Sequence, residues 1–153
     1  MERWYVACYK PGKGNIYKAM LALSHINGTT FCPQIRTFRP RTDRPGQSRQ
    51  IIEPLFPGYF FVSFDPGITH TSRIEQCPGV SYLLRNAGNI IPINDAIINE
   101  IMNLPVCKQS RDYYDAKRNQ HIAQKLNEFI QESDGEVRGA MFLAFLKTQE
   151  SRK

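Results

Sequence analysis

The sequence predicts an α+β protein, in which an antiparallel sheet with flanking helices is followed by a small C-terminal α-helical hairpin. Hydrophobic residues make up 41% of the 153 residues, which is enough for a packed core. Segments rich in rings and β-branched residues are interspersed with segments of helical period, in the order β-α-β-β-α-β-α. Because this order is not a regular strand–helix alternation, it favours helices packed on an antiparallel sheet.

The first 64 residues contain three predicted strands and one helix. The segment RWYVACY (3–9) has the composition of a strand. A helix capped by Asn15 follows, and Gly28 ends it. The segments TTFCPQIRTF (29–38) and IIEPLFPGYFFVSF (51–64) are predicted to be two long strands. Between them, prolines, a glycine and several arginines are typical of the exposed tip of a long hairpin.

The next segment continues the pattern of short elements. THTSRIEQ (69–76) is predicted to be a short helix or turn, and GVSYLLRN (79–86) a strand. NAGN (86–89) forms a turn into IIPI, and NDAIINEIMNL (94–104) is a helix capped by Asn94.

The last third of the chain predicts two helices after a linker. Residues 105–115 carry no clear period, and we interpret them as the linker. NQHIAQKLNEFIQ (119–131) has one apolar stripe of helical period. Ser133 and Glu136 have the spacing of a capping box before a second, mostly apolar helix. Such a hairpin needs another surface to cover its apolar stripes.

The charge balance favours an anionic partner. Twenty lysines and arginines stand against 14 acidic residues, which gives a net charge of +6. The four cysteines lack the spacing of a zinc site and are expected to be reduced thiols. No apolar run approaches a membrane span, and the N-terminus lacks the pattern of a secretion signal. We therefore expect a cytoplasmic monomer without a cofactor, a metal or membrane contact.

The sequence gives little support for catalysis. His25 and His121 are expected to be surface or boundary residues of helices. His70 lies between hydroxyl-bearing residues, but no acid stands at the spacing that would orient it as a base. KPGKGN does not match a phosphate-binding glycine loop. We therefore expect a binding protein and not an enzyme.

Two basic segments are candidates for contact with nucleic acid. Arginines are concentrated in residues 36–49, where Asp43 is the only acid, and their guanidinium groups suit phosphate. A solvated loop explains this segment equally well. Near the first predicted helix, basic residues are interleaved with tyrosines, as in proteins that bind unpaired bases. The candidates for nucleic-acid contact are Lys10, Lys13, Lys18, Arg41 and Arg44. A stand-alone module that binds single strands is therefore one functional hypothesis.

The strand at 59–64 presents two apolar faces. Tyr59, Phe61 and Ser63 share one face, and the residues between them share the other. One face packs on the domain's own core, and the other must be covered by something else or remain an apolar patch. The C-terminal hairpin is a candidate cover, whereas burial of both faces inside one sandwich is equally consistent with the pattern.

Several of these segments resemble a known family. WYVACYK, EPLFPGYFFVSFD, GVSYLLR and IIPI resemble the N-terminal domain of NusG-type transcription elongation factors. HTS at 70–72 and SDGEVR before an apolar run extend the resemblance to the RfaH-like antiterminator branch. The resemblance covers most of the chain, and the middle segment is its longest and most specific part.

The resemblance implies a transcription factor that bridges two parts of RNA polymerase. An aromatic patch would dock onto the clamp helices of the β′ subunit, and a polar motif would contact the gate loop of the β subunit. Bridging the DNA cleft in this way would oppose pausing and termination, and basic residues would contact the non-template DNA strand. The matching docking residues are Tyr9, Phe56, Tyr59 and Phe61 for the clamp helices, and His70, Thr71 and Ser72 for the gate loop.

The resemblance also implies a domain organisation with autoinhibition. Residues 1–104 would bind polymerase, and residues 116–153 would form a degenerate KOW-type domain that masks the docking patch. Glu53 and Arg138 match the salt bridge that latches the two domains. The chain has no glycine from 89 to 134, which favours a helical hairpin over refolding to a β-barrel and over the ribosomal protein contact of that barrel. The apolar side of the mask would consist of Phe129, Ile130, Phe142, Phe145 and Leu146.

Overall fold

The computed structural model describes residues 1–104 and 119–150, so the predicted linker at 105–115 lies outside the described residues. The chain divides into two compact units, each made of two separate segments. Unit 1 comprises Met1–Cys32 and Gly58–Ile98, and unit 2 comprises Pro33–Pro57 and the chain from Asn99 onward. The predicted α+β class is confirmed, with an antiparallel sheet and helices at the C-terminal end.

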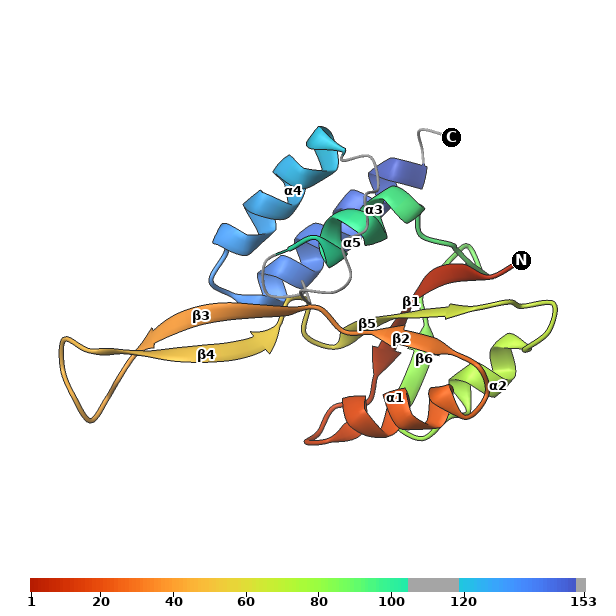
Figure 1. The fold of residues 1–153 in the computed structure, drawn as a ribbon, viewed down its shortest axis with the longest axis horizontal. Coiled ribbons are helices and arrows are strands. Elements are labelled where there is room, and N and C mark those ends of the chain that lie inside the picture. Colours follow the sequence, from red (N-terminus) through yellow and green to blue (C-terminus); the bar gives the residue numbers. More distant parts are fainter. Residues whose placement is uncertain (105–118, 151–153) are drawn as a thin grey trace. The chain divides into compact units, whose positions relative to one another are not determined.

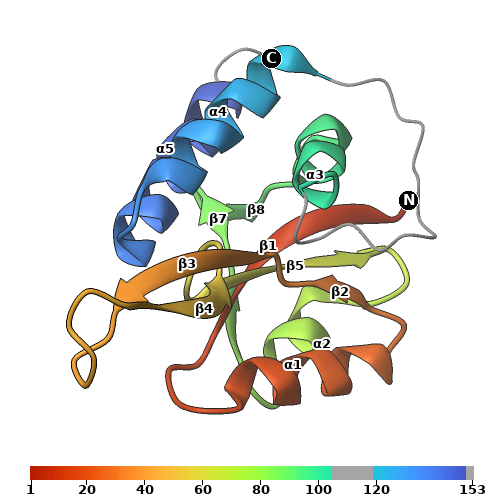
Figure 2. The ribbon, with the colours of Figure 1, turned by 60° about the vertical axis from the view of Figure 1, so that its left-hand side comes forward.

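Unit 1 is built on a four-stranded antiparallel sheet in the order β2-β5-β1-β6. Helices α1 and α2 lie beside the same face of this sheet in both views (Figures 1 and 2). The strands are β1 (Arg3–Tyr9), β2 (Thr29–Phe31), β5 (Tyr59–Phe64) and β6 (Val80–Leu83), and the helices are α1 (Asn15–Ser24) and α2 (Thr71–Glu75).

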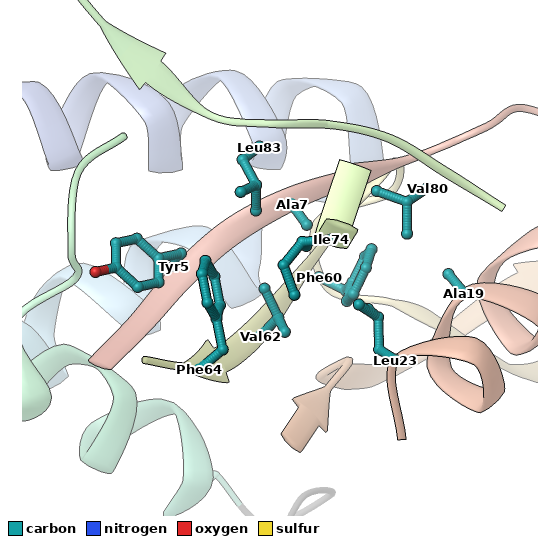
Figure 3. Packing of buried hydrophobic residues seen from close by; sticks show 10 residues of the cluster. All are labelled: Tyr5, Ala7, Ala19, Leu23, Phe60, Val62, Phe64, Ile74, Val80 and Leu83. Carbon is teal, nitrogen blue, oxygen red and sulfur yellow. The ribbon is translucent and has the colours of Figure 1, made fainter. Parts of the chain in front are cut away.

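The core of unit 1 lies between the sheet and these two helices (Figure 3). Phe60, Val62 and Phe64 of β5 point into it, which confirms the predicted alternation of that strand. Gly79 allows β6 to approach α1 closely, because a Cβ atom there would lie 2.3 Å from the carbonyl oxygen of Asn15. The remaining core residues are Tyr5, Ala7, Ala19, Leu23, Ile74, Val80 and Leu83.

The two long predicted strands are each divided in two. Residues 29–38 form β2 and, after Pro33, β3 (Gln34–Pro40). Residues 51–64 form β4 (Ser48–Pro54) and β5, separated by a turn in which Gly58 has a φ of 92°. The prediction of two continuous strands was therefore wrong, because the prolines and Gly58 interrupt the backbone where the chain leaves one sheet for another.

Short elements complete unit 1 and lead out of it. β7 (Arg85–Asn86) pairs with β8 (Asn89–Ile90), and the predicted turn between them is confirmed. Ala87 and Gly88 in this turn have φ angles of 51° and 84°, as two-residue hairpin turns require. Helix α3 (Asp95–Met102) begins after Asn94, whose side chain accepts a hydrogen bond from the Ala96 N–H and thus acts as the predicted cap.

Unit 2 combines the β3–β4 hairpin with α4 (Gln120–Gln131) and α5 (Gly135–Glu150), which lie side by side in both views (Figures 1 and 2). Asn119 caps α4 by accepting a hydrogen bond from the Ile122 N–H. Asp134, and not the predicted Ser133, caps α5, because its carboxylate accepts from the Glu136 N–H. None of the described helices is long and apolar enough to cross a membrane.

Candidate functional site

The first part of the candidate site is the second face of the unit 1 sheet, opposite the core. We define this second face by Cys8, Tyr59, Phe61 and Tyr82, together with Phe31 beside Phe61. Phe61 is only 1% exposed, and its ring is stacked with that of Phe31 at a centroid distance of 6.1 Å. Neither Tyr59 nor Phe61 belongs to the core cluster on the other face.

Cys8 joins two tyrosines on the second face. It is paired with Tyr59 on β5 and with Tyr82 on β6, so the three side chains form a row across the strands. The hydrogen bond with Cys8 raises the pKa of Tyr82 from 10.0 to about 12. Burial raises the pKa of the Cys8 thiol and that of Tyr59. The row is therefore uncharged at neutral pH, which suits contact with an apolar partner surface.

Replacing Cys8 with alanine should lower the pKa of Tyr82 from about 12 toward 10, because the hydrogen bond that holds its proton is lost. At pH 11 the variant should then show about one more ionised tyrosine by absorbance at 295 nm. The raised pKa contributes stability that is complete below pH 10 and is lost as the pH rises through about 12. A Tyr82→Phe variant, which lacks this hydroxyl, shows which part of the absorbance change belongs to Tyr82. Equal absorbance of Cys8→Ala and wild type at pH 11 would contradict the effect of Cys8 on the pKa of Tyr82.

Tyr9 lies apart from the other predicted docking residues of unit 1. Its ring packs against the core cluster, with its centroid 6.3 Å from that of Phe60. Its hydroxyl accepts a hydrogen bond from the Gly58 N–H at 2.9 Å. A bulge in β1 between Cys8 and Tyr9 shifts the register there. The structure therefore brings Cys8, and not Tyr9, together with Tyr59.

In unit 2, the predicted docking residue Phe56 is packed against the predicted mask. Its ring is stacked on that of Phe142 with a centroid distance of 4.1 Å and an interplanar angle of 11°. Phe129 meets both rings edge-on, and Phe145 packs edge-on against Phe129. All four rings are buried, whereas Ile130 and Leu146 are half-buried. Phe56 is therefore not accessible to another protein in this state.

Among the described charged residues of unit 2, Arg138 on α5 is the most completely buried, with no exposed side-chain surface. Its Nη2 donates to Glu53 Oε1 on β4 at 2.9 Å, as predicted for this pair. The guanidinium also donates to three backbone carbonyl oxygens, those of Pro54 (3.3 Å), Leu55 (2.8 Å) and Glu132 (2.9 Å). Four acceptors thus compensate the burial of this charge.

The predicted polar motif is held by the start of α2. His70 is the N-cap residue, and its Nδ1 accepts a hydrogen bond from the Ser72 N–H at 3.1 Å. The Ser72 hydroxyl lies 2.8 Å from the same nitrogen. Because Nδ1 accepts, the ring proton is placed on Nε2. His70 and Ser72 are exposed and Thr71 is partly exposed, so all three can offer hydrogen bonds to a partner.

The predicted nucleic-acid residues fall into two groups in different units. Lys10, Lys13 and Lys18 are exposed before and at the start of α1 in unit 1. Arg41 and Arg44 lie in the loop of the β3–β4 hairpin in unit 2, and Arg41 is paired with Asp43 at 2.9 Å. Among the described residues, no cluster of histidine, cysteine or acidic side chains could hold a metal ion. Cys8 and Cys77 are reduced thiols, and Cys107 lies outside the described residues.

Comparison with known proteins places most of the chain in one family. Residues 2–102 match the family described as "Transcription termination factor nusG". Among solved structures, one described as "Domain interaction in Thermotoga maritima NusG" is similar, with 23% identity over 68% of this chain and a TM-score of 0.39. The present chain spans 57% of the length of that protein. Because the family match extends over well more than half of its residues, the chain belongs to the family of the transcription termination factor NusG.

Proposed function

We propose that this chain is a transcription elongation and antitermination factor of the RfaH-like type, which binds RNA polymerase and has no catalytic activity. The observation that carries the proposal is the family match over residues 2–102. That range contains every predicted polymerase contact, from Tyr9 to Ser72. The factor would act in the cytoplasm, where transcription takes place.

The second face of unit 1 is the proposed docking surface for the clamp helices of the β′ subunit. Its support is the position of Tyr59 and Phe61 outside the core cluster, together with the uncharged row around Cys8. Aromatic anchors that enter a groove on a partner carry most of the binding energy in many protein interfaces. Phe61 and Phe56 are both 1% exposed, so each would have to be uncovered before it met polymerase, and Phe56 would have to leave the rings of α4 and α5.

The exposed cap of α2 is the proposed contact for the gate loop of the β subunit. Hydrogen bonds between His70 and Ser72 fix the geometry of these two side chains, which is a condition for directional hydrogen bonds, and Thr71 lies between them. Contact at both sites would bridge the DNA cleft, keep the clamp closed and oppose pausing and termination. The exposed lysines before and within α1, with Arg41 and Arg44, would contact the non-template DNA strand through its phosphates.

Residues 116–153 are the proposed regulatory domain, which holds the factor in an inactive state. Two contacts within unit 2 support this: Phe142 covers Phe56, and Arg138 is paired with Glu53. Both contacts would have to break before Phe56 could meet polymerase. The helical state of α4 and α5 agrees with the composition of this segment, which disfavours refolding to a β-barrel and the ribosomal protein contact of that barrel.

The function is tested by capture of purified RNA polymerase on the immobilised full-length chain without nucleic acid. Tyr59→Ala should weaken capture by about 30-fold or more, since removing an aromatic anchor costs about 2 kcal/mol or more. The measurement is repeated in the Glu53→Gln background, in which the hairpin of α4 and α5 is expected to be loosened. Masking of the docking surface then does not hide the effect of Tyr59→Ala.

Tyr17→Ala is the matched control, because it removes an exposed tyrosine from α1 on the core side of the sheet. Equal capture by the Tyr59→Ala and Tyr17→Ala variants, both folded by circular dichroism, would sink the docking proposal. A chain that binds single-stranded DNA but captures no polymerase in either background would be the stand-alone nucleic-acid module instead.

A further inference from the structure

The β3–β4 hairpin has two faces of different character. The strands pair in register from Gln34↔Pro54 to Pro40↔Ser48, so alternate side chains share a face. One face carries Ile35, which is buried, and Glu53, which binds Arg138. The other, which we call the free face, carries Arg36 and Phe38 with their cross-strand partners Ile52 and Gln50, and all four are exposed.

Phe38 on the free face is 70% exposed, which is unusual for a large ring on a paired strand. Phe38 lies opposite Gln50, and the next pair on the same face contains Arg36. A ring, an amide and a guanidinium are therefore neighbours on one surface. Arg44 in the hairpin loop is also exposed, whereas Arg49, the cross-strand partner of position 39, belongs to the face of Ile35 and Glu53. In Figures 1 and 2 the loop of this hairpin extends past the ends of α4 and α5.

We propose that the free face of the β3–β4 hairpin binds an unpaired nucleic-acid strand, with a base stacked on Phe38 and phosphates held by Arg36 on that face and Arg44 in the loop. The charges favour this partner: residues 36–49 contain five arginines and one acid, that acid is paired with Arg41, and Arg36 lies on the free face itself. A nucleic-acid strand brings one negative charge per nucleotide together with flat bases that stack on aromatic rings. The bases of a duplex are already stacked on one another, so duplex DNA would leave Phe38 unused.

This site is separate from the lysines at α1. Binding of a free strand to it does not depend on the proposed function; only its role on the transcription complex rests on that proposal. There the unpaired strand would be non-template DNA or nascent RNA, which share the same chemistry. The experiment therefore compares labelled dT15, rU15 and a 15-base-pair duplex by fluorescence anisotropy with the full-length chain, and it does not require polymerase.

Phe38→Ala should weaken binding of dT15 about tenfold or more, whereas Phe38→Trp should bind as well as wild type or better, since stacking needs a ring. Phe38→Leu keeps the apolar bulk without the ring and should behave like the alanine variant. Arg36→Ala should reduce the slope of log affinity against log salt by about 0.7, the value for one phosphate contact on a single strand. Ile68→Ala, at an exposed apolar residue of unit 1 outside the free face, is the matched control and should change little.

A 5-bromodeoxyuridine oligonucleotide locates the site, because its photocrosslink should fall in the peptide that contains residues 34–54. A crosslink confined to the α1 region, equal affinity of Phe38→Ala and wild type, or duplex binding as tight as that of dT15 would overturn the proposal. Loss of polymerase capture by Phe38→Ala without nucleic acid, or dimerisation that depends on Phe38, would show that the free face binds protein instead. Polymerase capture that depends on Tyr59 is a separate readout, so failure of either proposal leaves the other testable.

Discussion

Replacing Arg138 with methionine is expected to lower the stability of unit 2 by about 3–5 kcal/mol, the usual cost of removing one partner from a buried charge pair. Methionine fills much of the same volume but donates no hydrogen bond. The carbonyl oxygens of Leu55 and Glu132 would lose a donor, and the Glu53 carboxylate would lose its cation. Arg138→Lys keeps the charge, yet the donors of a single ammonium group cannot reach all the acceptors that the planar guanidinium contacts. An intermediate loss of stability is therefore expected.

The Glu53 partner should matter less than Arg138 itself. In Glu53→Gln the amide oxygen can still accept from Nη2, and the three backbone carbonyls still bind the guanidinium, so we expect a loss of about 1–3 kcal/mol. The double variant should lose less than the sum of the two single losses, because the first substitution has already broken the pair.

Hydrogen exchange read by mass spectrometry separates a local effect from a global one. Peptides from β3–β4 and from α5 should exchange faster in Arg138→Met, while peptides from β1 and β5 keep their protection. Urea unfolding followed at 222 nm gives the free energy. If the methionine variant is as stable and as protected as wild type, the hydrogen bonds of Arg138 do not hold the helices to the hairpin.

Local patterns were sufficient for those parts of the fold that depend on a strand's own alternation or a helix's own ends. Phe60, Val62 and Phe64 could be assigned to the core because a pleated strand turns every second side chain to one face. Asn94 could be assigned as a cap because its oxygen meets an N–H two residues away. Such interactions are local in sequence, and residue type and spacing therefore reveal them.

The parts that could not be predicted depend on neighbours far along the chain. The residue pattern of a strand does not determine which strand it pairs with. The passage of the chain from one sheet to another at Pro33 could therefore not be predicted, although a proline is a signal for such a break. The position of Tyr9 depends on a bulge in the pairing of β1 with β6. The three carbonyl partners of Arg138 depend on the path of the backbone around Leu55, 83 residues away, and only a resemblance to a family pointed to Glu53.

The sequence also identified the aromatic residues of the candidate site without separating their roles. Phe56 and Phe61 belong to one ring-rich segment, yet the structure assigns them to different units. Cys8 and Tyr82 were not singled out, because a lone cysteine and an edge-strand tyrosine carry no motif; strand pairing alone brings them together. The charge of residues 36–49 was visible, but the free face with Phe38 required the register of β3 with β4.

Truncating Phe142 to alanine should be the most disruptive change to the ring cluster of unit 2. Its side chain is fully buried between Phe56 and Phe129, and removing a buried phenylalanine costs about 3–5 kcal/mol through lost burial and the cavity left behind. The stacked and edge-on contacts add about 0.5–1.5 kcal/mol for each pair beyond the buried area. Phe38→Ala, at an exposed ring of the same unit, is the matched control and should change stability by less than about 0.5 kcal/mol.

The same variant links stability to function, because Phe142 covers a residue proposed to dock on polymerase. If the masked state is favoured over the unmasked state by a few kcal/mol, destabilising the masked state by about 3–5 kcal/mol would expose Phe56 in a large fraction of molecules. Capture of polymerase should then rise by about tenfold or more relative to wild type, and Tyr59→Ala should cancel the gain. A Phe142→Ala chain that is destabilised as expected but captures no more polymerase would show that the helices stabilise the β3–β4 hairpin without regulating docking.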